Sequence, residues 1–222
     1  MRAAAAIVRR DLRLELRTHE AVPAMALLAL SIFVLLHFGL DRDRLDGDLA
    51  AGVLWMALLL ATVLGTTRLY ATESDGRLDG LLMAPIDRIS LFAAKATVLF
   101  CFLVAVQLVA VPAFAVLLLA APALEALPGL TLVLVAADAC LAVIGALVSA
   151  LAAAAGTREL LVPVVLLPLM VPVMIAGAAA TEPLLTATGD PTASMHWLVI
   201  LVLYGGVFGL VAFALFEELI EE

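Results

Sequence analysis

Six long apolar runs set the limits on what this chain can fold into. They extend over residues 21–40, 50–67, 91–120, 130–155, 160–180 and 197–216. A helix needs about 20 apolar residues to cross a hydrocarbon core about 30 Å thick, and each run approaches or exceeds that length. A backbone inside lipid must satisfy its own hydrogen bonds, so each run is expected to be a helix. The sequence therefore predicts an all-α membrane protein with six transmembrane helices, organised as a single transmembrane domain over residues 1–222.

The amino-acid composition excludes a water-soluble globule. Hydrophobic residues make up 65% of the 222 positions and charged residues 14%, compared with about half and about a quarter in ordinary soluble domains. The net charge is −8, and the basic residues form no groove or patch, which argues against nucleic acid as a partner. The sequence also lacks CxxC, HExxH, GxxxxGKS and GxSxG motifs. We therefore predict no catalytic residue and no metal site.

The distribution of Lys and Arg predicts how the chain is oriented. Five arginines precede the first run, three arginines lie between the second and third runs with Lys95 just inside the start of the third, and one arginine lies between the fourth and fifth, which makes ten on one side. The opposite side has only Arg42 and Arg44, which lie among four aspartates. Because basic residues collect on the cytoplasmic side of a membrane, both termini are expected in the cytoplasm.

Residues 1–20 form a segment of their own before the first run. The stretch IVRRDLRLELR places Ile7 and Leu14 among arginines, a pattern typical of an amphipathic helix that lies along the membrane interface. Since this segment carries mixed charge and the run after it is long, we expect no cleaved signal peptide. Two roles remain open for the segment: a topology anchor, or an elbow helix that frames a moving bundle.

The longest strongly polar connection, residues 68–90, contains the stretch ESDGRLDGLLMAP, Glu73 to Pro85. Its acidic residues favour the start of a helix, and Leu78, Leu81 and Leu82 give that helix one apolar stripe. On the predicted orientation the segment is cytoplasmic. The stripe is expected either to fold back against the membrane interface or to insert into a groove on a cytoplasmic partner.

Two stretches of the sequence are specific enough to suggest a family. The first is AGVLWMALLLATVLGTTRLYATESDGRLDGLLMAPIDRISLFAAK, Ala51 to Lys95, and the second is VPVVLLPLMVPVMIAGAAA, Val162 to Ala180, with its LP and VP dipeptides. Both resemble the CcmB family, haem exporter protein B of cytochrome c maturation. Chain length, six spans and orientation agree with that resemblance. It implies an ABC-2-type exporter permease, a multi-pass protein of the bacterial inner membrane.

The resemblance also implies partners. The chain would be a non-catalytic transporter subunit, and ATP would be bound and hydrolysed by a separate CcmA-like ATPase. Further implied partners are a CcmC-like membrane protein, a small CcmD-like subunit, a CcmE-like haem chaperone and a second copy of this chain in the lipid bilayer. No directly bound cofactor is implied. Haem is the implied substrate, and two versions stay open: export of haem itself, or release of the haem-loaded chaperone.

In related permeases the connection after the second span forms a coupling helix that seats on the ATPase. The resemblance carries this role onto six residues of the polar segment: Glu73, Asp75, Gly76, Leu78, Leu82 and Pro85. The family has a bulkier or acidic residue where Gly80 stands. ATP-driven closure of the ATPase would move the seated helix, and the attached spans would shift as rigid bodies.

Four residues inside the runs are candidates for a translocation or conformational role. Asp138 is an acid in the fourth run, and an ionisable residue inside a membrane is a functional candidate by default. The alternative is a position near the outer interface, or a neutral state held by a neighbour. Pro163, Pro168 and Pro172 interrupt the fifth run. They predict either a flexing point with freed carbonyl groups or a static bend.

Other residues in the runs carry structural expectations. Lys95 lies near the cytoplasmic start of the third run, where its side chain is expected to reach the lipid headgroups. Gly145 with Ser149, and Gly205 with Gly209, form small-xxx-small faces that are typical of contacts between helices, either within one chain or between two copies.

Three other classes of protein remain in competition. The first is a generic ABC-2 exporter permease for a lipid, a drug or a polysaccharide. The second is an intramembrane enzyme that uses Asp138, which would need a second polar group beyond Gln107 and the outer histidines His37 and His196. The third is a proton-coupled transporter, which would show internal repeats and several buried ionisable groups. The sequence shows neither of these two features.

Overall fold

The structure is a computed structural model that describes residues 2–40, 44–69, 88–119, 124–155, 158–186 and 194–218. Seven α-helices run through these residues: α1 Arg2–Thr18, α2 Ala21–Gly39, α3 Gly47–Arg68, α5 Arg88–Leu117, α6 Leu127–Ala155, α7 Arg158–Thr181 and α8 Met195–Glu218. Two short 3-10 helices, η2 Leu124–Ala126 and η3 Glu182–Leu184, precede α6 and follow α7. The described ranges contain no strand.

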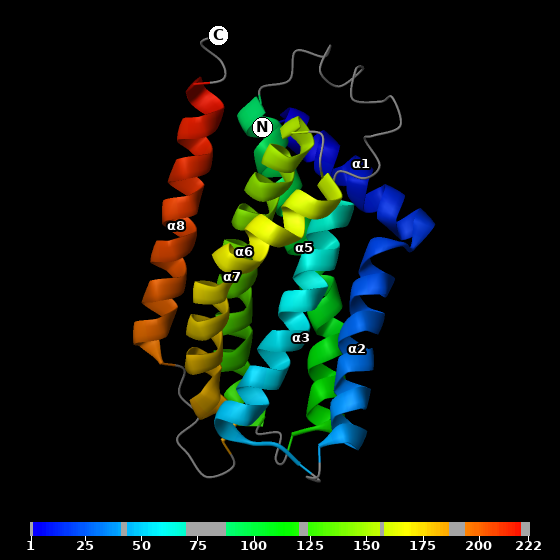
Figure 1. Ribbon diagram of the computed structural model, residues 1–222, viewed down its shortest axis with the longest axis vertical. Helices are drawn as coiled ribbons and strands as arrows, with labels where there is room; N and C mark the ends of the chain where they lie inside the picture. The colour runs from blue at the N-terminus through cyan, green and yellow to red at the C-terminus, as the bar shows by residue number, and fades with distance from the viewer. Residues whose placement is uncertain are drawn as a thin grey trace.

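Six of these helices, α2, α3, α5, α6, α7 and α8, are long and apolar enough to cross a membrane. The prediction of an all-α protein with six spans is therefore confirmed, and the helix bounds agree with the apolar runs to within a few residues. Figure 1 shows the six long helices side by side, with α1 lying across the end of the bundle at which both chain termini are drawn.

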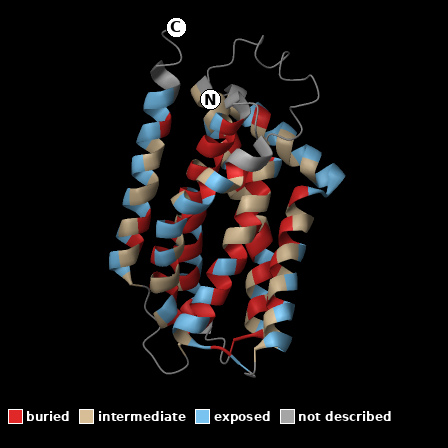
Figure 2. Ribbon diagram, viewed as in Figure 1, coloured by how far each residue is buried: buried red, intermediate tan, exposed pale blue. Residues whose placement is uncertain are grey.

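Helix α6 is the centre of the bundle and α8 lies at its edge. The apolar window of α6 is 67% buried, compared with 17% for that of α8, and Figure 2 shows the contrast between the two helices. Helix α6 contacts α3, α5, α7 and α8. A helix that is apolar on every side and central in this way is expected to carry small residues where its neighbours cross it.

Gly145 and Ser149 of α6 provide such a crossing point. A Cβ atom on Gly145 would lie 2.6 Å from Leu99 Cδ2 and 2.9 Å from Thr66 Oγ1, so a larger residue would displace these side chains of α5 and α3. The Ser149 hydroxyl donates a hydrogen bond to the Thr66 carbonyl oxygen at 3.0 Å. The expected contact at this pair is confirmed.

The other small-residue pair is used only in part within this chain. A Cβ atom on Gly205 would lie 3.2 Å from Cys140 Cβ, so Gly205 lets α8 approach α6. Nothing lies within 4 Å of the equivalent position on Gly206 or Gly209. Within the described residues of this chain, Gly205 therefore forms a helix contact, and the position of Gly209 is open to a second copy.

At the opposite end from α1, Arg44 caps helix α5. Its Nη1 donates hydrogen bonds to the carbonyl oxygens of Val116 at 3.0 Å and Leu119 at 3.1 Å, while the Leu45 amide donates to the Leu118 carbonyl at 2.7 Å. The last carbonyl groups of a helix lack partners within it and favour a positive charge nearby. Arg44 therefore has a structural role, which explains why a basic residue occurs on the side of the membrane that has few of them.

Candidate functional site

The six residues expected to couple to an ATPase, Glu73, Asp75, Gly76, Leu78, Leu82 and Pro85, lie outside the described residues. The structure does describe what flanks them. Helix α3 ends at Arg68 and helix α5 begins at Arg88, so these two helix ends hold the segment on either side. The candidate site is therefore built from the two helix ends and from α1, which crosses α5 beside them (Figure 1).

Helix α1 packs through a stripe of residues spaced three or four apart. Ile7 is buried, and Val8, Asp11 and Leu12 are partly buried, so this stripe faces the bundle while the arginines face outward. The next residue of the stripe, Glu15, stabilises the connection between α1 and α2 at residues 19–20, which we call the elbow. Its Oε1 accepts a hydrogen bond from the Val22 amide at 2.8 Å.

The elbow follows from simple chemistry at the start of α2. The first amides of a helix have no partner within it, and a carboxylate is favoured there by the helix dipole. Between the two helices, His19 takes a positive φ of 52°, a left-handed conformation that changes the chain direction over a short connection. Helix α1 is therefore held to α2 at one end and to α5 along its length.

Lys95 of α5 is the most deeply buried charged residue among those described, with an exposed fraction of 0%. Its Nζ lies 2.9 Å from Asp11 Oδ2 in α1 and donates to the Leu69 carbonyl oxygen, just after α3, at 3.4 Å. The expectation that Lys95 reaches the lipid headgroups is wrong. Helix α5 is rotated about its axis so that Lys95 points toward α1 and the end of α3, away from lipid.

This contact joins three helices at one point, and two of them flank the segment 70–87. A buried ammonium needs both an opposite charge and further acceptors to offset its desolvation, and Asp11 and Leu69 supply them here. Sequence reasoning missed Asp11. The available signal was its place on the apolar stripe of α1, four residues after Ile7, where an acid is costly unless it meets a base.

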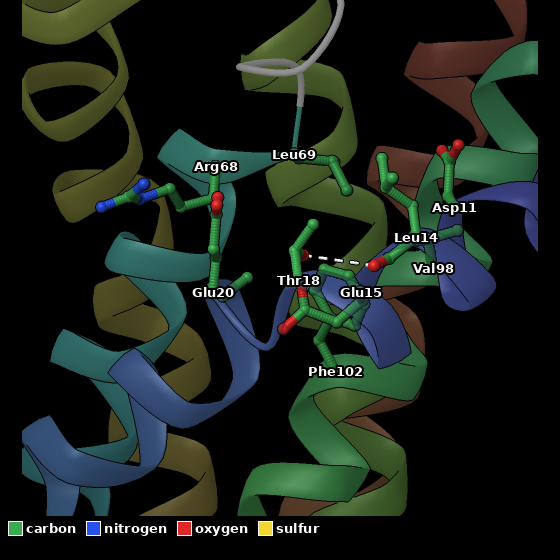
Figure 3. A pocket seen from close by; sticks show the side chains of 10 residues that line it. Asp11, Leu14, Glu15, Thr18, Glu20, Arg68, Leu69, Val98 and Phe102 are labelled. Carbon is green, nitrogen blue, oxygen red and sulfur yellow. Dashed lines mark hydrogen bonds between the residues drawn. The ribbon is translucent and has the colours of Figure 1, made fainter.

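A small pocket lies beside this contact, between the elbow and the end of α3. Figure 3 shows Glu20 beside Arg68 of α3 at one side of the view, Asp11 of α1 at the other side, and Glu15 between them. Its volume is about 60 Å³, enough for a few water molecules, each of which needs roughly 10–15 Å³ by this measure. The pocket therefore has room for a few water molecules beside the charged groups and is too small for a haem-sized ligand.

Asp138 lies deep in α6 and is hydrogen-bonded to α5. It is about 16 Å along the helix from Leu127, at 1.5 Å per residue, and its exposed fraction is 1%. Gln107 Nε2 donates to Asp138 Oδ1 at 2.8 Å, whereas Oδ2 has no hydrogen-bond partner among the described residues. Asp138 is the twelfth of the 29 residues of α6, less than halfway along the helix, and its polar partner is Gln107.

The three prolines of the fifth run all lie within α7. Pro168 and Pro172 are exposed on one side of the helix, and Figure 1 shows that α7 slants across the bundle at its start and then runs along it. The Tyr204 hydroxyl of α8 donates to the Leu169 carbonyl at 3.0 Å. Because Pro172 has no N–H, the Pro168 carbonyl four residues earlier lacks a donor within the helix, and the Leu169 carbonyl bound by Tyr204 is the next one along the chain.

Sequence reasoning did not single out Tyr204. A tyrosine in the middle of an apolar helix must find a partner for its hydroxyl, and that was the available signal. The outer histidines do not meet: His37 contacts Phe38, and His196 contacts Trp197 edge to face with ring centroids 5.5 Å apart. Among the described residues no three His, Cys, Asp or Glu side chains are grouped so as to hold a metal ion.

Comparison with known proteins gives consistent matches over most of the chain. The family model described as CcmB protein matches residues 2–219. A protein named Heme exporter protein B from Rhodobacter capsulatus is 34% identical over 176 residues, which cover 78% of this chain and 79% of that protein. Proteins of the same name from Bradyrhizobium diazoefficiens and Paracoccus denitrificans are 32% and 30% identical. The match to the Bradyrhizobium protein covers 82% of each chain. The match to the Paracoccus protein covers 89% of this chain and 90% of that protein.

Proposed function

The chain belongs to the CcmB family, and from this premise we propose that it is the permease subunit of an ABC transporter that serves cytochrome c maturation. It is a multi-pass protein of the bacterial inner membrane with six spans, and its family membership makes it a membrane component of haem export. The chain is a transporter subunit rather than an enzyme. In this proposal ATP is bound and hydrolysed by a separate CcmA-like subunit.

The observation that carries the proposal is the contact of Lys95 with Asp11 and with the Leu69 carbonyl. It ties together the two helices that flank the segment 70–87 and adds α1 to them. A force applied to that segment by an ATPase would reach α3 and α5 as one body, because each is held to the other where the segment begins and ends. Helices linked in this way shift together rather than bend separately.

The displacement would then pass to the centre of the bundle through polar contacts with α6. Ser149 of α6 is bonded to Thr66 of α3, and Asp138 of α6 is bonded to Gln107 of α5. Both hydrogen bonds resist breaking during such a movement, because inside the membrane their polar groups would have no water to bind instead. We propose that Asp138 acts here as a conformational residue, and that the bend of α7 at Pro163, Pro168 and Pro172 provides the flexing point.

The remaining partners follow from the family. The assembly would contain a second copy of this chain, a CcmC-like membrane protein, a small CcmD-like subunit and a CcmE-like haem chaperone. A single chain with one coupling segment engages one ATPase subunit, so a pair of ATPase subunits calls for two copies related by a two-fold axis. Hydrolysis would drive either haem export or the release of the haem-loaded chaperone.

Purification from native membranes with identification of the co-eluting proteins tests the proposal. We expect an ABC ATPase and a CcmC-like protein to co-elute. Replacing Asp75→Lys together with Leu82→Asp should remove the ATPase, because it reverses a charge and places an acid on the apolar stripe. Glu125→Lys, an exposed charge reversal at the opposite end, serves as the control. Retention of the ATPase by the double variant would exclude the coupling role of this segment.

A further inference from the structure

An open groove runs along the crossing of α1 and α5. Its volume is about 500 Å³, within the range of about 300–1,000 Å³ that small-molecule sites occupy. Small and apolar residues make up most of its walls, among them Ala5, Val8 and Leu12 of α1 and Ala93 of α5. Such a surface accepts a slender hydrocarbon chain because no bulky side chain fills the space between the two helices.

Two arginines also line the groove, Arg9 and Arg13, and both side chains are exposed. They are four residues apart on α1, so they lie on the same side of the helix, about 6 Å from each other. Neither forms an ion pair with another described residue. The acids of α1 are engaged elsewhere: Asp11 with Lys95 and Arg10, and Glu15 with the Val22 amide. This side of α1 therefore has positive charge that the described chain does not neutralise.

The groove lies at the depth where lipid headgroups meet acyl chains. Ala93 and Thr97 of α5 are about 8 Å and about 14 Å along the helix axis from Arg88, inside the apolar span Ile89–Leu117. Helix α1 crosses the end of the bundle above them (Figure 1). The apolar walls thus face the hydrocarbon side, and long arginine side chains on α1 reach the headgroup level.

We propose that this groove binds one anionic phospholipid, with an acyl chain between α1 and α5 and the phosphate group held by Arg9 and Arg13. Two guanidinium groups suit a phosphate because each offers a fork of donors to its oxygens. A free phosphate ion would satisfy the arginines and leave the apolar walls exposed to water. A zwitterionic lipid would fill the walls and leave the positive charge uncompensated. The bound lipid fastens α1 to the cytoplasmic end of α5, next to the Lys95 contact.

Lipid retention by the full-length protein tests this inference. The protein is purified in detergent, stripped of lipid and titrated with phosphatidylglycerol or phosphatidylcholine of identical acyl chains, and bound lipid is counted by native mass spectrometry. We expect phosphatidylglycerol to be preferred, and Arg9→Gln with Arg13→Gln to weaken its binding by about tenfold or more, since each Arg near an anionic surface contributes about fivefold. Arg10→Gln with Arg17→Gln removes the same number of positive charges outside the groove, and it should weaken binding clearly less than the groove pair does.

A second pair of variants tests the groove without altering charge. Ala93→Trp fills the space, and because Ala93 is exposed the substitution leaves the core intact. It should reduce phosphatidylglycerol binding while the arginines remain. Val109→Trp, exposed on the same helix but away from the groove, should have no effect.

Three results would overturn the inference. The first is unchanged binding in both groove variants, and the second is an equal loss in the Arg10 and Arg17 variant. The third is displacement of the lipid by inorganic phosphate alone, which would show that the arginines bind a free anion. Cross-linking from Ala5→Cys to another subunit, in a native complex that carries no such lipid, would assign the groove to a protein partner and would likewise exclude the lipid.

Discussion

Lys95 Nζ and Asp11 Oδ2 lie 2.9 Å apart although 84 positions separate the two residues in the chain. The side chain of Lys95 is 1% exposed and that of Asp11 is 12% exposed, so water screens the pair only weakly. A buried ion pair adds little to stability compared with apolar residues of similar size, because desolvation offsets most of the attraction. We infer that the pair instead helps to align α1 with α5, because either charge would be costly if it were buried without the other.

Removing one partner of this pair is expected to be costly. Lys95→Met leaves Asp11 with only Arg10 and should lower the free energy of unfolding by about 3 kcal/mol. Asp11→Leu combined with Lys95→Met should recover most of that loss, because an apolar pair carries no desolvation cost. Unfolding of the purified protein, followed by circular dichroism against temperature, measures both effects. Equal stability of Lys95→Met and the unchanged protein would contradict the pairing.

The double variant also separates stability from function. If the ion pair aligns the helix ends that flank the segment 70–87, the variant Asp11→Leu with Lys95→Met should still fold and bind the ATPase. The amount of cytochrome c matured for each ATP hydrolysed should be lower than in the unchanged protein. Arg10→Gln, which leaves the Lys95 contact in place, is the matched control. A normal yield of cytochrome c in the double variant would show that packing alone aligns these helices.

Two substitutions of Asp138 test whether the protein needs its ionisable carboxyl group or only an oxygen that accepts the hydrogen bond from Gln107. Asp138→Asn keeps an oxygen for Gln107 Nε2 and should retain stability and cytochrome c maturation. Asp138→Leu leaves the Gln107 amide unpaired in the bundle and should cost about 2 kcal/mol. Thermal unfolding and the amount of haem-stained cytochrome c measure the two outcomes. Loss of maturation in a stable Asp138→Asn variant would mean that the carboxyl group itself acts.

Gly177 and Trp55 are expected to show coupled effects. A Cβ atom on Gly177 would lie 2.5 Å from Trp55 Cζ2, so Gly177→Ala should destabilise the protein by about 2 kcal/mol through overpacking. Trp55→Phe removes that ring atom and also the bond from Nε1 to Thr181 Oγ1 at 2.9 Å. The double variant should therefore lose less than the sum of the single losses. Gly206→Ala, with open space around it, is the control, and simple additivity would refute the contact.

Arg44 allows the cap of α5 to be tested together with the predicted orientation. Arg44→Gln should lower the free energy of unfolding by up to about 1 kcal/mol, because two carbonyl groups lose a charged donor. Orientation should not change, since the ten basic residues on the other side remain. Labelling of Asp46→Cys by a membrane-impermeant thiol reagent should occur from the periplasmic side. Labelling from the cytoplasmic side would reverse the orientation and remove the basis for coupling at the segment 70–87.

Much of the fold was predictable because it depends on local properties of the chain. The length and apolar character of each run determine whether it can cross a membrane, and they do so without reference to other runs. The amphipathic pattern of residues 2–18 likewise indicated a separate helix before the first span. The small-residue spacing of Gly145 and Ser149 marked a helix contact, although it did not identify Thr66 as the partner.

The tertiary structure alone decided which polar residues meet. Lys95 could face lipid or protein depending on the rotation of α5 about its axis. The sequence shows that Asp11 is an acid, but it does not show which basic residue Asp11 contacts. Asp138 and Gln107 were each recognisable as polar residues in apolar runs, yet their bond depends on the register of α5 against α6. Gly209 had the same spacing as a contact residue and meets nothing within 4 Å. Hydrophobic length is a property of consecutive residues, whereas side-chain pairing requires the relative rotation and depth of two helices, which only the packed bundle determines.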